Sequence, residues 1–216
     1  GNVNLRYNPC LEIRGQEQYL THNEVVRLLH VVQDGSHAER NICMIMLAYI
    51  HGLRVSELLS LRLSDFELAT RHISISRMKN GFSTIHPLLF EEVMAIKQWL
   101  VVRNTIVARS GELDEDRLFI SCTGRALSRQ QFYNILSAAS ERAALSVPAH
   151  PHMLRHACGY ALADNGIDTR LIQDYLGHRN IRHTVIYTAS NSARFAKIWG
   201  DRRKEKKQLF GLFCKS

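Results

Sequence analysis

Several features of other protein classes are missing from this chain of 216 residues. No apolar stretch approaches the ~18 uninterrupted residues of a membrane span. The opening GNVNLRYNPC lacks the basic-then-apolar order of a signal peptide. We therefore expect a soluble, intracellular protein with no membrane partner. The chain also has no G-x-x-x-x-G-K-[ST] phosphate loop and no cluster of carboxylates for Mg²⁺, and we expect neither cofactor nor metal.

Cysteine is sparse and has no regular spacing. The five cysteines are Cys10, Cys43, Cys122, Cys158 and Cys214. Their odd number, their wide separation and the lack of any C-x-x-C pair argue against a disulfide framework and against a zinc ribbon. We expect reduced thiols.

Acidic residues are fewer than basic ones, since Asp and Glu number 20 and Lys and Arg number 28. The resulting net charge of +8 makes a polyanion such as nucleic acid the leading partner. A solvated basic surface without a ligand explains the charge equally well. The apolar content of 45% is ordinary for a folded globular chain.

The apolar spacing predicts a mainly α-helical domain with a small antiparallel β-sheet. Thr21 and Glu24 form a capping box before one helix, and an almost wholly apolar helix ends at Gly52, a suitable left-handed cap. The segment RHISISRMKNGFSTIHPL alternates around an Asn-Gly pair and predicts a β-hairpin with Lys79 near its tip. Further helices are expected over 90–103, 128–145, 151–165 and 170–177, the last capped by Thr169, and one more begins within 181–190.

The stretch HPHMLRHACGY, residues 150–160, concentrates polar donors. If Pro151 opens a helix, His152, Arg155 and His156 share one face. The two histidines have the spacing of a helical zinc site, but Arg155 adds a permanent cation and no Glu stands between them as a general base. The same donors suit a phosphate, because guanidinium binds two oxygens and imidazole donates to a third. For this stretch alone, a structural or solvated role stays equally open.

Other polar residues stand at predicted element ends or turns: Arg54, Lys79, His178 and Tyr187. Each alone has an ordinary structural explanation. In this order, together with H-x-x-R, they resemble the tyrosine recombinase (phage integrase) family, whose signature is Arg, Lys, His-x-x-Arg, His and Tyr. The resemblance covers about residues 20–200. It is strong for fimbrial phase-variation recombinases of the FimB/FimE type, through GFSTIHPLL, LSRQQFYNI, NGIDTRLIQDYLGHRNIRHT and YTASN.

The resemblance implies a recombinase catalytic domain over 20–200. We expect residues 1–19 to form a flexible N-terminal extension. The basic and apolar tail over 201–216 would either be flexible or dock on its own domain or on a neighbouring subunit.

The resemblance also implies roles for single residues. Tyr187 would be the nucleophile that forms a 3′-phosphotyrosine, and Lys79 would protonate the leaving 5′ oxygen. His152 would act as general base or proton shuttle. The groups that would stabilise the phosphate charge are Arg54, Arg155 and His178, with Glu57 orienting Arg54. The tentative base-reading residues are Ser128, Arg129, Gln130 and Gln131, for which an exposed amphipathic surface is an equal alternative.

The implied partners are double-stranded DNA with inverted-repeat sites, three further copies in a homotetramer, and DNA-bending accessory proteins, all in the bacterial cytoplasm at the nucleoid. The implied outcome is inversion of a promoter-bearing segment that switches fimbrial expression. Alternatives with the same chemistry are a phage or mobile-element integrase and a Xer-like resolvase. Alternatives of another class are a non-catalytic architectural DNA-binding protein and a histidine metalloenzyme.

Overall fold

Helices dominate the structure, a computed structural model that describes residues 19–77, 83–110, 116–178, 193–201 and 208–213. In chain order the helices are α1 (His22–Gln33), α2 (Ala38–Ile50), α3 (Val55–Leu59), α4 (Phe90–Ser110), α5 (Arg129–Arg142), α6 (Pro151–Asp164) and α7 (Thr169–Tyr175). A short 3-10 turn η1 (Leu63–Asp65) and the strands β1 (Phe66–Glu67), β2 (His72–Ser76) and β3 (Ser83–Pro87) lie between α3 and α4. The predicted fold class, mainly helical with a small antiparallel sheet, is confirmed.

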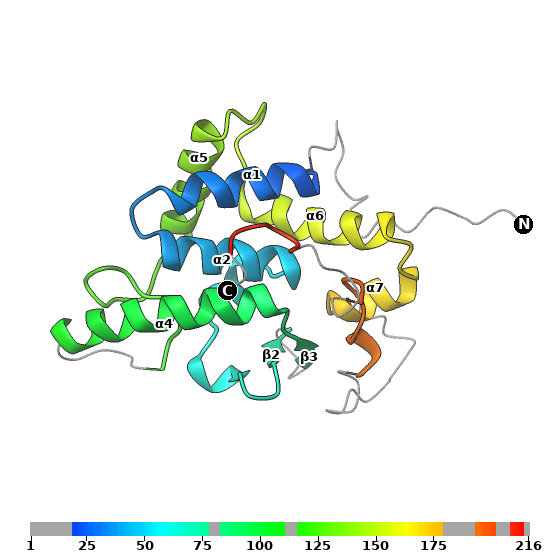
Figure 1. Cartoon of the computed structure of the whole chain (residues 1–216), viewed down its shortest axis with the longest axis horizontal. Coiled ribbons are helices and arrows are strands. Elements are labelled where there is room, and N and C mark those ends of the chain that lie inside the picture. Colours follow the sequence, from blue (N-terminus) through cyan, green and yellow to red (C-terminus); the bar gives the residue numbers. More distant parts are fainter. Residues whose placement is uncertain (1–18, 78–82, 111–115, 179–192, 202–207, 214–216) are drawn as a thin grey trace, which may run out of the picture.

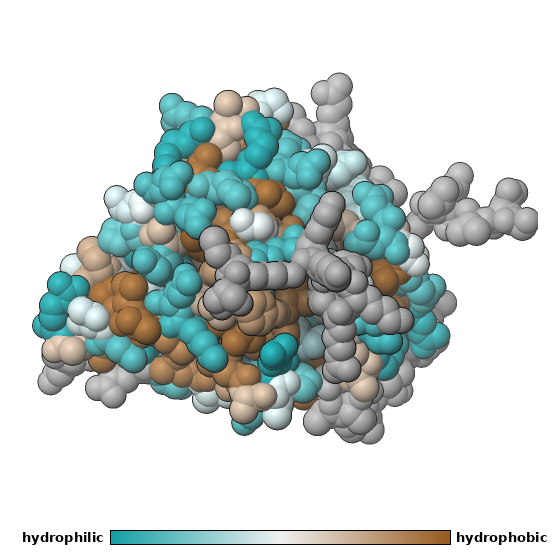
Figure 2. All heavy atoms as spheres, viewed as in Figure 1, coloured by the Kyte–Doolittle hydropathy of each residue, from teal (hydrophilic) through white to brown (hydrophobic). Residues whose placement is uncertain are grey.

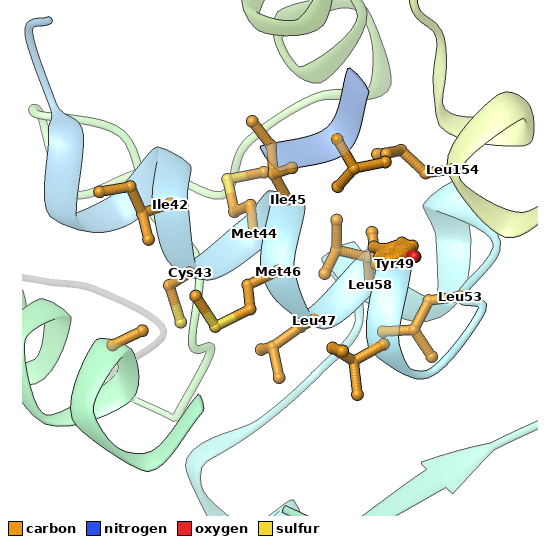
Figure 3. Packing of buried hydrophobic residues seen from close by; sticks show 14 of the residues in the cluster. Ile42, Cys43, Met44, Ile45, Met46, Leu47, Tyr49, Leu53, Leu58 and Leu154 are labelled. Carbon is orange, nitrogen blue, oxygen red and sulfur yellow. The ribbon is translucent and has the colours of Figure 1, made fainter. Parts of the chain in front are cut away.

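Helix α2 lies at the centre of the helical assembly and contacts α1, α4 and α6 (Figure 1). Every residue from Arg40 to Ile50 is buried, and the side chains of α2 point into the core on all sides (Figure 3). A helix that is apolar all round must be enclosed by other elements. The prediction that this helix is central is confirmed.

The chain turns sharply after α2. Gly52 has a φ of +58°, and a Cβ built on it would lie 2.2 Å from Leu176 Cδ2. Only glycine fits both the left-handed backbone and this close approach to the end of α7. The turn brings Arg54 to the N-cap of α3.

Most of the predicted helix starts are confirmed. The predicted end of α4 at residue 103 is wrong, because no Gly or Pro interrupts residues 104–110 and the helix continues to Ser110. The amide of Glu24 donates to Thr21 Oγ1 at 3.2 Å in the capping box of α1. Helix α6 begins at Pro151. The prediction that Thr169 caps α7 is wrong by one residue, because Asp168 has the extended backbone of the N-cap, with a ψ of 136°, and Thr169 is already helical.

The predicted hairpin is confirmed as the antiparallel pair β2 and β3. Ile73 faces His86 and Ile75 faces Thr84, and all four side chains are buried on one face of the sheet. Strand β1 adds a third strand beside β2, with Phe66 opposite Ile73, which the sequence did not predict. The hairpin tip at 78–82 and the helix predicted within 181–190 lie outside the described residues.

Residues 208–213 pack against their own chain, across α1 and the start of α4 (Figure 1). His22 Nε2 and His30 Nε2 each donate to a backbone carbonyl of this segment, those of Leu209 and Phe210, at 3.0 Å in both cases. The Glu91 carboxylate accepts from the Phe210 amide at 3.0 Å. Phe210 is thereby buried beside the helices.

The face of the molecule seen in Figure 2 divides into two regions. Hydrophilic residues gather over α1 and α5, and apolar residues gather over α4, where Val101 is 71% exposed. Among the described helices, none is both long enough and apolar enough to cross a membrane.

Candidate active site

Arg155 lies where the ends of α2 and α7 meet. Its Nη1 donates to the Gly52 carbonyl, and its Nη2 donates to the Leu176 carbonyl at 3.0 Å. The same Nη2 lies 3.4 Å from Nε2 of His178, just beyond α7. Residues 52, 155 and 176–178, which are far apart in the sequence, therefore form one cradle, and two of the predicted site residues are in contact within it.

Glu57 connects the second predicted arginine to this cradle. Its Oε1 accepts the backbone amide of Arg54 at 2.7 Å, and its Oε2 lies 3.4 Å from Arg54 Nη1. The Glu57 side chain is 0% exposed and that of Arg54 is 41% exposed. The carboxylate thus fixes the backbone of Arg54 from the inside, while the guanidinium keeps an open side toward solvent. This geometry agrees with an orienting role for Glu57.

Arg77, which sequence reasoning missed, lies beneath the cradle. Its Nη1 donates to Glu57 Oε1 at 3.0 Å, and both side chains are 0% exposed. Its Nη2 donates to the carbonyls of His51 at 2.8 Å and Tyr175 at 2.9 Å, and its Nε donates to Thr84 Oγ1 at 3.1 Å. One guanidinium therefore joins the sheet to the ends of α2 and α7.

A sequence signal for Arg77 existed. Ile73 and Ile75 alternate with polar residues along β2, and period-two spacing places residue 77 on the same buried face. A buried arginine needs an acidic partner. Glu57 is that partner.

Burial governs the ionisation of the site. It lowers the pKa of His178 to about 4, and the nearby cations Arg155 and Arg54 add to the effect. Partial burial of its ring lowers the pKa of His152 as well, with further contributions from His150 and Arg155, although the residue as a whole stays exposed. The pKa of Arg155 falls to about 9, chiefly through burial and then through Arg77 and Arg54, so this guanidinium stays charged at neutral pH. The histidines are neutral at that pH and able to accept or donate a proton.

Positive charge is in excess at the cradle and directly beneath it. Among the described residues, Arg54, Arg77 and Arg155 bring three positive charges there, and the carboxylate in contact with them is that of Glu57. Bidentate guanidinium groups of this kind recognise the oxygens of an anion such as a phosphate. The arrangement is therefore suited to binding a phosphate group.

His152 occupies the first turn of α6, where its side chain is exposed. Its ring lies edge-on to that of buried His156, with centroids 4.2 Å apart, and it is nearly parallel to His150 at 6.5 Å. Within the described part of the chain, no group of three His, Cys, Asp or Glu residues is placed to hold a metal ion. Lys79 and Tyr187 lie outside the described residues.

The tentative base-reading residues stand together at the exposed start of α5. Ser128 and Gln131 use their side chains in the capping box, with Ser128 Oγ accepting the Gln131 amide at 3.1 Å. Gln130 Nε2 donates to Asn134 Oδ1 at 2.9 Å. These bonds hold part of each of the three side chains, and Arg129 adds the positive charge that a DNA phosphate backbone attracts.

The fold and the cradle together define the catalytic domain of a tyrosine recombinase. The family model described as Phage integrase family matches residues 18–194. The Type 1 fimbriae regulatory protein FimB of Escherichia coli strain K12 is 54% identical over 184 residues, which cover 85% of this chain and 90% of FimB. FimE of the same strain is 53% identical, over 85% of this chain and 91% of FimE.

A solved structure, that of XerA recombinase, superposes with a TM-score of 0.68 at 26% identity. The match covers 85% of this chain and 65% of the XerA chain. The chain belongs to the phage integrase family, and the resemblance stated from its sequence motifs is confirmed.

Proposed function

We propose that this recombinase cleaves and rejoins double-stranded DNA at inverted-repeat sites and inverts a promoter-bearing segment that switches fimbrial expression. The observation that carries the proposal is the cradle, in which Arg155 and Arg54 are held by the buried elements beneath them, with Arg54 open to solvent. A phosphodiester fits that excess of positive charge. The fimbrial outcome is supported by the similarity to FimB and FimE over nearly all of their length.

Cleavage begins with Tyr187 as the nucleophile. Its hydroxyl oxygen attacks the phosphorus while neutral His152 takes the hydroxyl proton. The new bond joins the tyrosine oxygen to phosphorus, the bond to the 5′ oxygen breaks, and Lys79 gives that oxygen a proton. The product is a 3′-phosphotyrosine and a free 5′-hydroxyl, so the bond energy is kept for rejoining by a second 5′-hydroxyl.

The charge on the non-bridging oxygens is stabilised by Arg54 and Arg155, with His178 as a further donor. Glu57 acts through Arg54, whose backbone amide it fixes. Loss of one preorganised donor of this kind costs on the order of 10²-fold or more in rate. All of these groups come from the chain itself, and the reaction needs no cofactor or metal.

DNA inversion also implies how many protomers and DNA sites come together. Four protomers hold two DNA sites and exchange strands in pairs, with DNA-bending accessory proteins, in the bacterial cytoplasm at the nucleoid. The catalytic domain spans 20–200, with 1–19 as an extension and 201–216 as a tail. The exposed start of α5, with Arg129, reads or positions the DNA, and the net charge of +8 favours the same partner.

The test is a plasmid in which the candidate fimbrial promoter segment lies between its inverted repeats. Expression of the parent chain should invert the segment, and Tyr187→Phe should not, while both bind the repeats in a gel shift. The same sites are also placed as direct repeats on a second plasmid and singly on two separate plasmids. Excision of the direct-repeat segment without inversion would favour a resolvase, and joining of the separate plasmids would favour an integrase. Binding without any strand exchange would favour an architectural protein.

A further inference from the structure

Two histidines that the mechanism does not use are completely buried beside the cradle. His51 caps the end of α2 and His86 lies on β3, and both are 0% exposed. Their Nδ1 atoms lie 2.8 Å apart. Two nitrogens at this distance share one hydrogen, so a hydrogen bond joins the two rings whichever of them donates.

The pair continues into a chain of polar groups. His51 Nε2 donates to a carboxylate oxygen of Glu92, which is buried in the first turn of α4. The other oxygen of Glu92 accepts the Leu89 amide at 2.6 Å. Burial, followed by the charges of His51 and Arg77, lowers the pKa of His86, so this ring is neutral. Two hydrogen bonds thus link β3 to α4, one between His86 and His51 and one between His51 and the carboxylate of Glu92.

Tyr175, the last residue of α7, closes the network on the other side. Its ring stacks on that of His86, with centroids 3.7 Å apart and an interplanar angle of 11°. Its hydroxyl donates to the Ile50 carbonyl at 2.7 Å and lies 3.2 Å from His51 Nδ1. The side chain of Tyr175 is fully buried.

The four residues therefore connect elements that carry the proposed site. Arg54 follows His51 by three residues, and His178 follows Tyr175 by three. His86 lies on β3, whose partner strand β2 leads directly to Arg77. An apolar core would bury these elements equally well, but hydrogen bonds and a ring stack have preferred geometries that fix their relative positions.

We propose that His51, His86, Glu92 and Tyr175 form a positioning network that aligns the segments bearing Arg54 and His178 for DNA cleavage. The inference rests on the proposed function, because it concerns the rate of that reaction. All four side chains are buried, so none of them would contact the DNA phosphate directly. They act through the backbone elements that they join.

The decisive comparison is between two substitutions at one position. His86→Phe keeps a ring against Tyr175 but removes the hydrogen bond to His51. His86→Asn loses the ring but places an amide where Nδ1 was, so that the bond can form again. Single-turnover cleavage of a nicked suicide duplex is measured at saturating protein, together with the Kd for the duplex and the Tm.

A positioning role predicts that His86→Phe slows cleavage on the order of 10-fold, since small displacements of catalytic groups are costly. The Kd should stay within about twofold, because the loss concerns alignment and not DNA affinity. His86→Asn should recover most of the rate. Equal rates for Phe and parent, or no advantage of Asn over Phe, would overturn the proposal.

A second pair of variants decides the matter if a change at His86 unfolds the chain. Tyr175→Phe removes one hydroxyl from the network and keeps the stacked ring. Tyr49→Phe is the matched control, since Tyr49 is equally buried but its hydroxyl pairs with His22 Nδ1 at 2.8 Å, outside the network. Slower cleavage by Tyr175→Phe alone, at unchanged Kd, supports the proposal, and parent-like cleavage refutes it.

Failure of the proposed function would look different. In that case the parent chain itself would form no covalent adduct with a duplex that contains its true site, and the network proposal would fall with it. Where the parent forms the adduct, the variants test the network alone.

Discussion

Replacing Arg77 by Met tests the idea that a buried ion pair holds the base of the cradle. Met keeps much of the length and apolar volume of the side chain but removes every donor. Glu57 then keeps a buried negative charge, with Arg54 Nη1 at 3.4 Å as its remaining cation. The carbonyls of His51 and Tyr175 and the hydroxyl of Thr84 also lose their bonds to Arg77. Breaking one side of a fully buried pair costs ~3–5 kcal/mol.

Urea unfolding followed by circular dichroism measures this loss. With a slope of about 2 kcal/mol per molar, the midpoint should fall by roughly 1.5–2.5 M. Adding Glu57→Gln removes the stranded charge, so the double variant should recover at least ~1 kcal/mol. A loss below ~1 kcal/mol in Arg77→Met, or no recovery in the double variant, would refute the reasoning.

Three further predictions concern His178, Lys79 and the glycines at positions 166 and 177. The free energy of unfolding should fall as the pH drops from about 6.5 toward 4. The reason is that a histidine in the unfolded chain binds a proton below about pH 6.5, whereas the pKa of His178 in the folded chain is about 4. Equal urea midpoints at pH 7 and pH 5 would contradict this. Lys79→Ala should slow cleavage by roughly 10²-fold or more. A duplex with sulfur in place of the bridging 5′ oxygen should restore most of the lost rate, because a thiolate leaves without a proton. If the variant is equally slow on that duplex, Lys79 is not the acid. Gly177→Ala should destabilise the chain more than Gly166→Ala. Both glycines have a left-handed backbone, but only at Gly177 does the new Cβ meet Arg77 Cγ, at 2.6 Å. Equal losses of stability in thermal unfolding would argue against this close contact.

Local signals in the sequence were enough for most of the fold. Capping boxes act over three residues, the left-handed turn at Gly52 needs one glycine, and the apolar residues of α2 mark it as central. Strand β1 was missed because two residues carry no periodicity. The boundary of α7 was misplaced because Asp168 and Thr169 are both good N-cap residues, and the backbone conformation chose between them.

The prediction of the site residues depended on family resemblance and not on local sequence signals. The roles of Arg54, Arg155 and His178 came from family resemblance, since spacing alone left a zinc site and a solvated cluster open. The structure adds that Arg155 lies beside His178, and that Glu57 contacts both Arg54 and the buried Arg77. The contacts beneath them join residues 35 and 124 positions apart, as in His51 with His86 and His51 with Tyr175, and no local pattern encodes such pairs.

The central claim is that Tyr187 forms a covalent bond with DNA without help from a metal. The most direct measurement incubates the parent chain and Tyr187→Phe with a nicked suicide duplex containing the inverted repeats, in EDTA, followed by denaturing electrophoresis and mass spectrometry of the DNA-linked peptide. If Tyr187 is the nucleophile, an adduct should form with the parent chain alone, with the nucleotide on Tyr187. Retarded complexes without any adduct, on a duplex that contains the true site, would contradict it and favour an architectural DNA-binding protein.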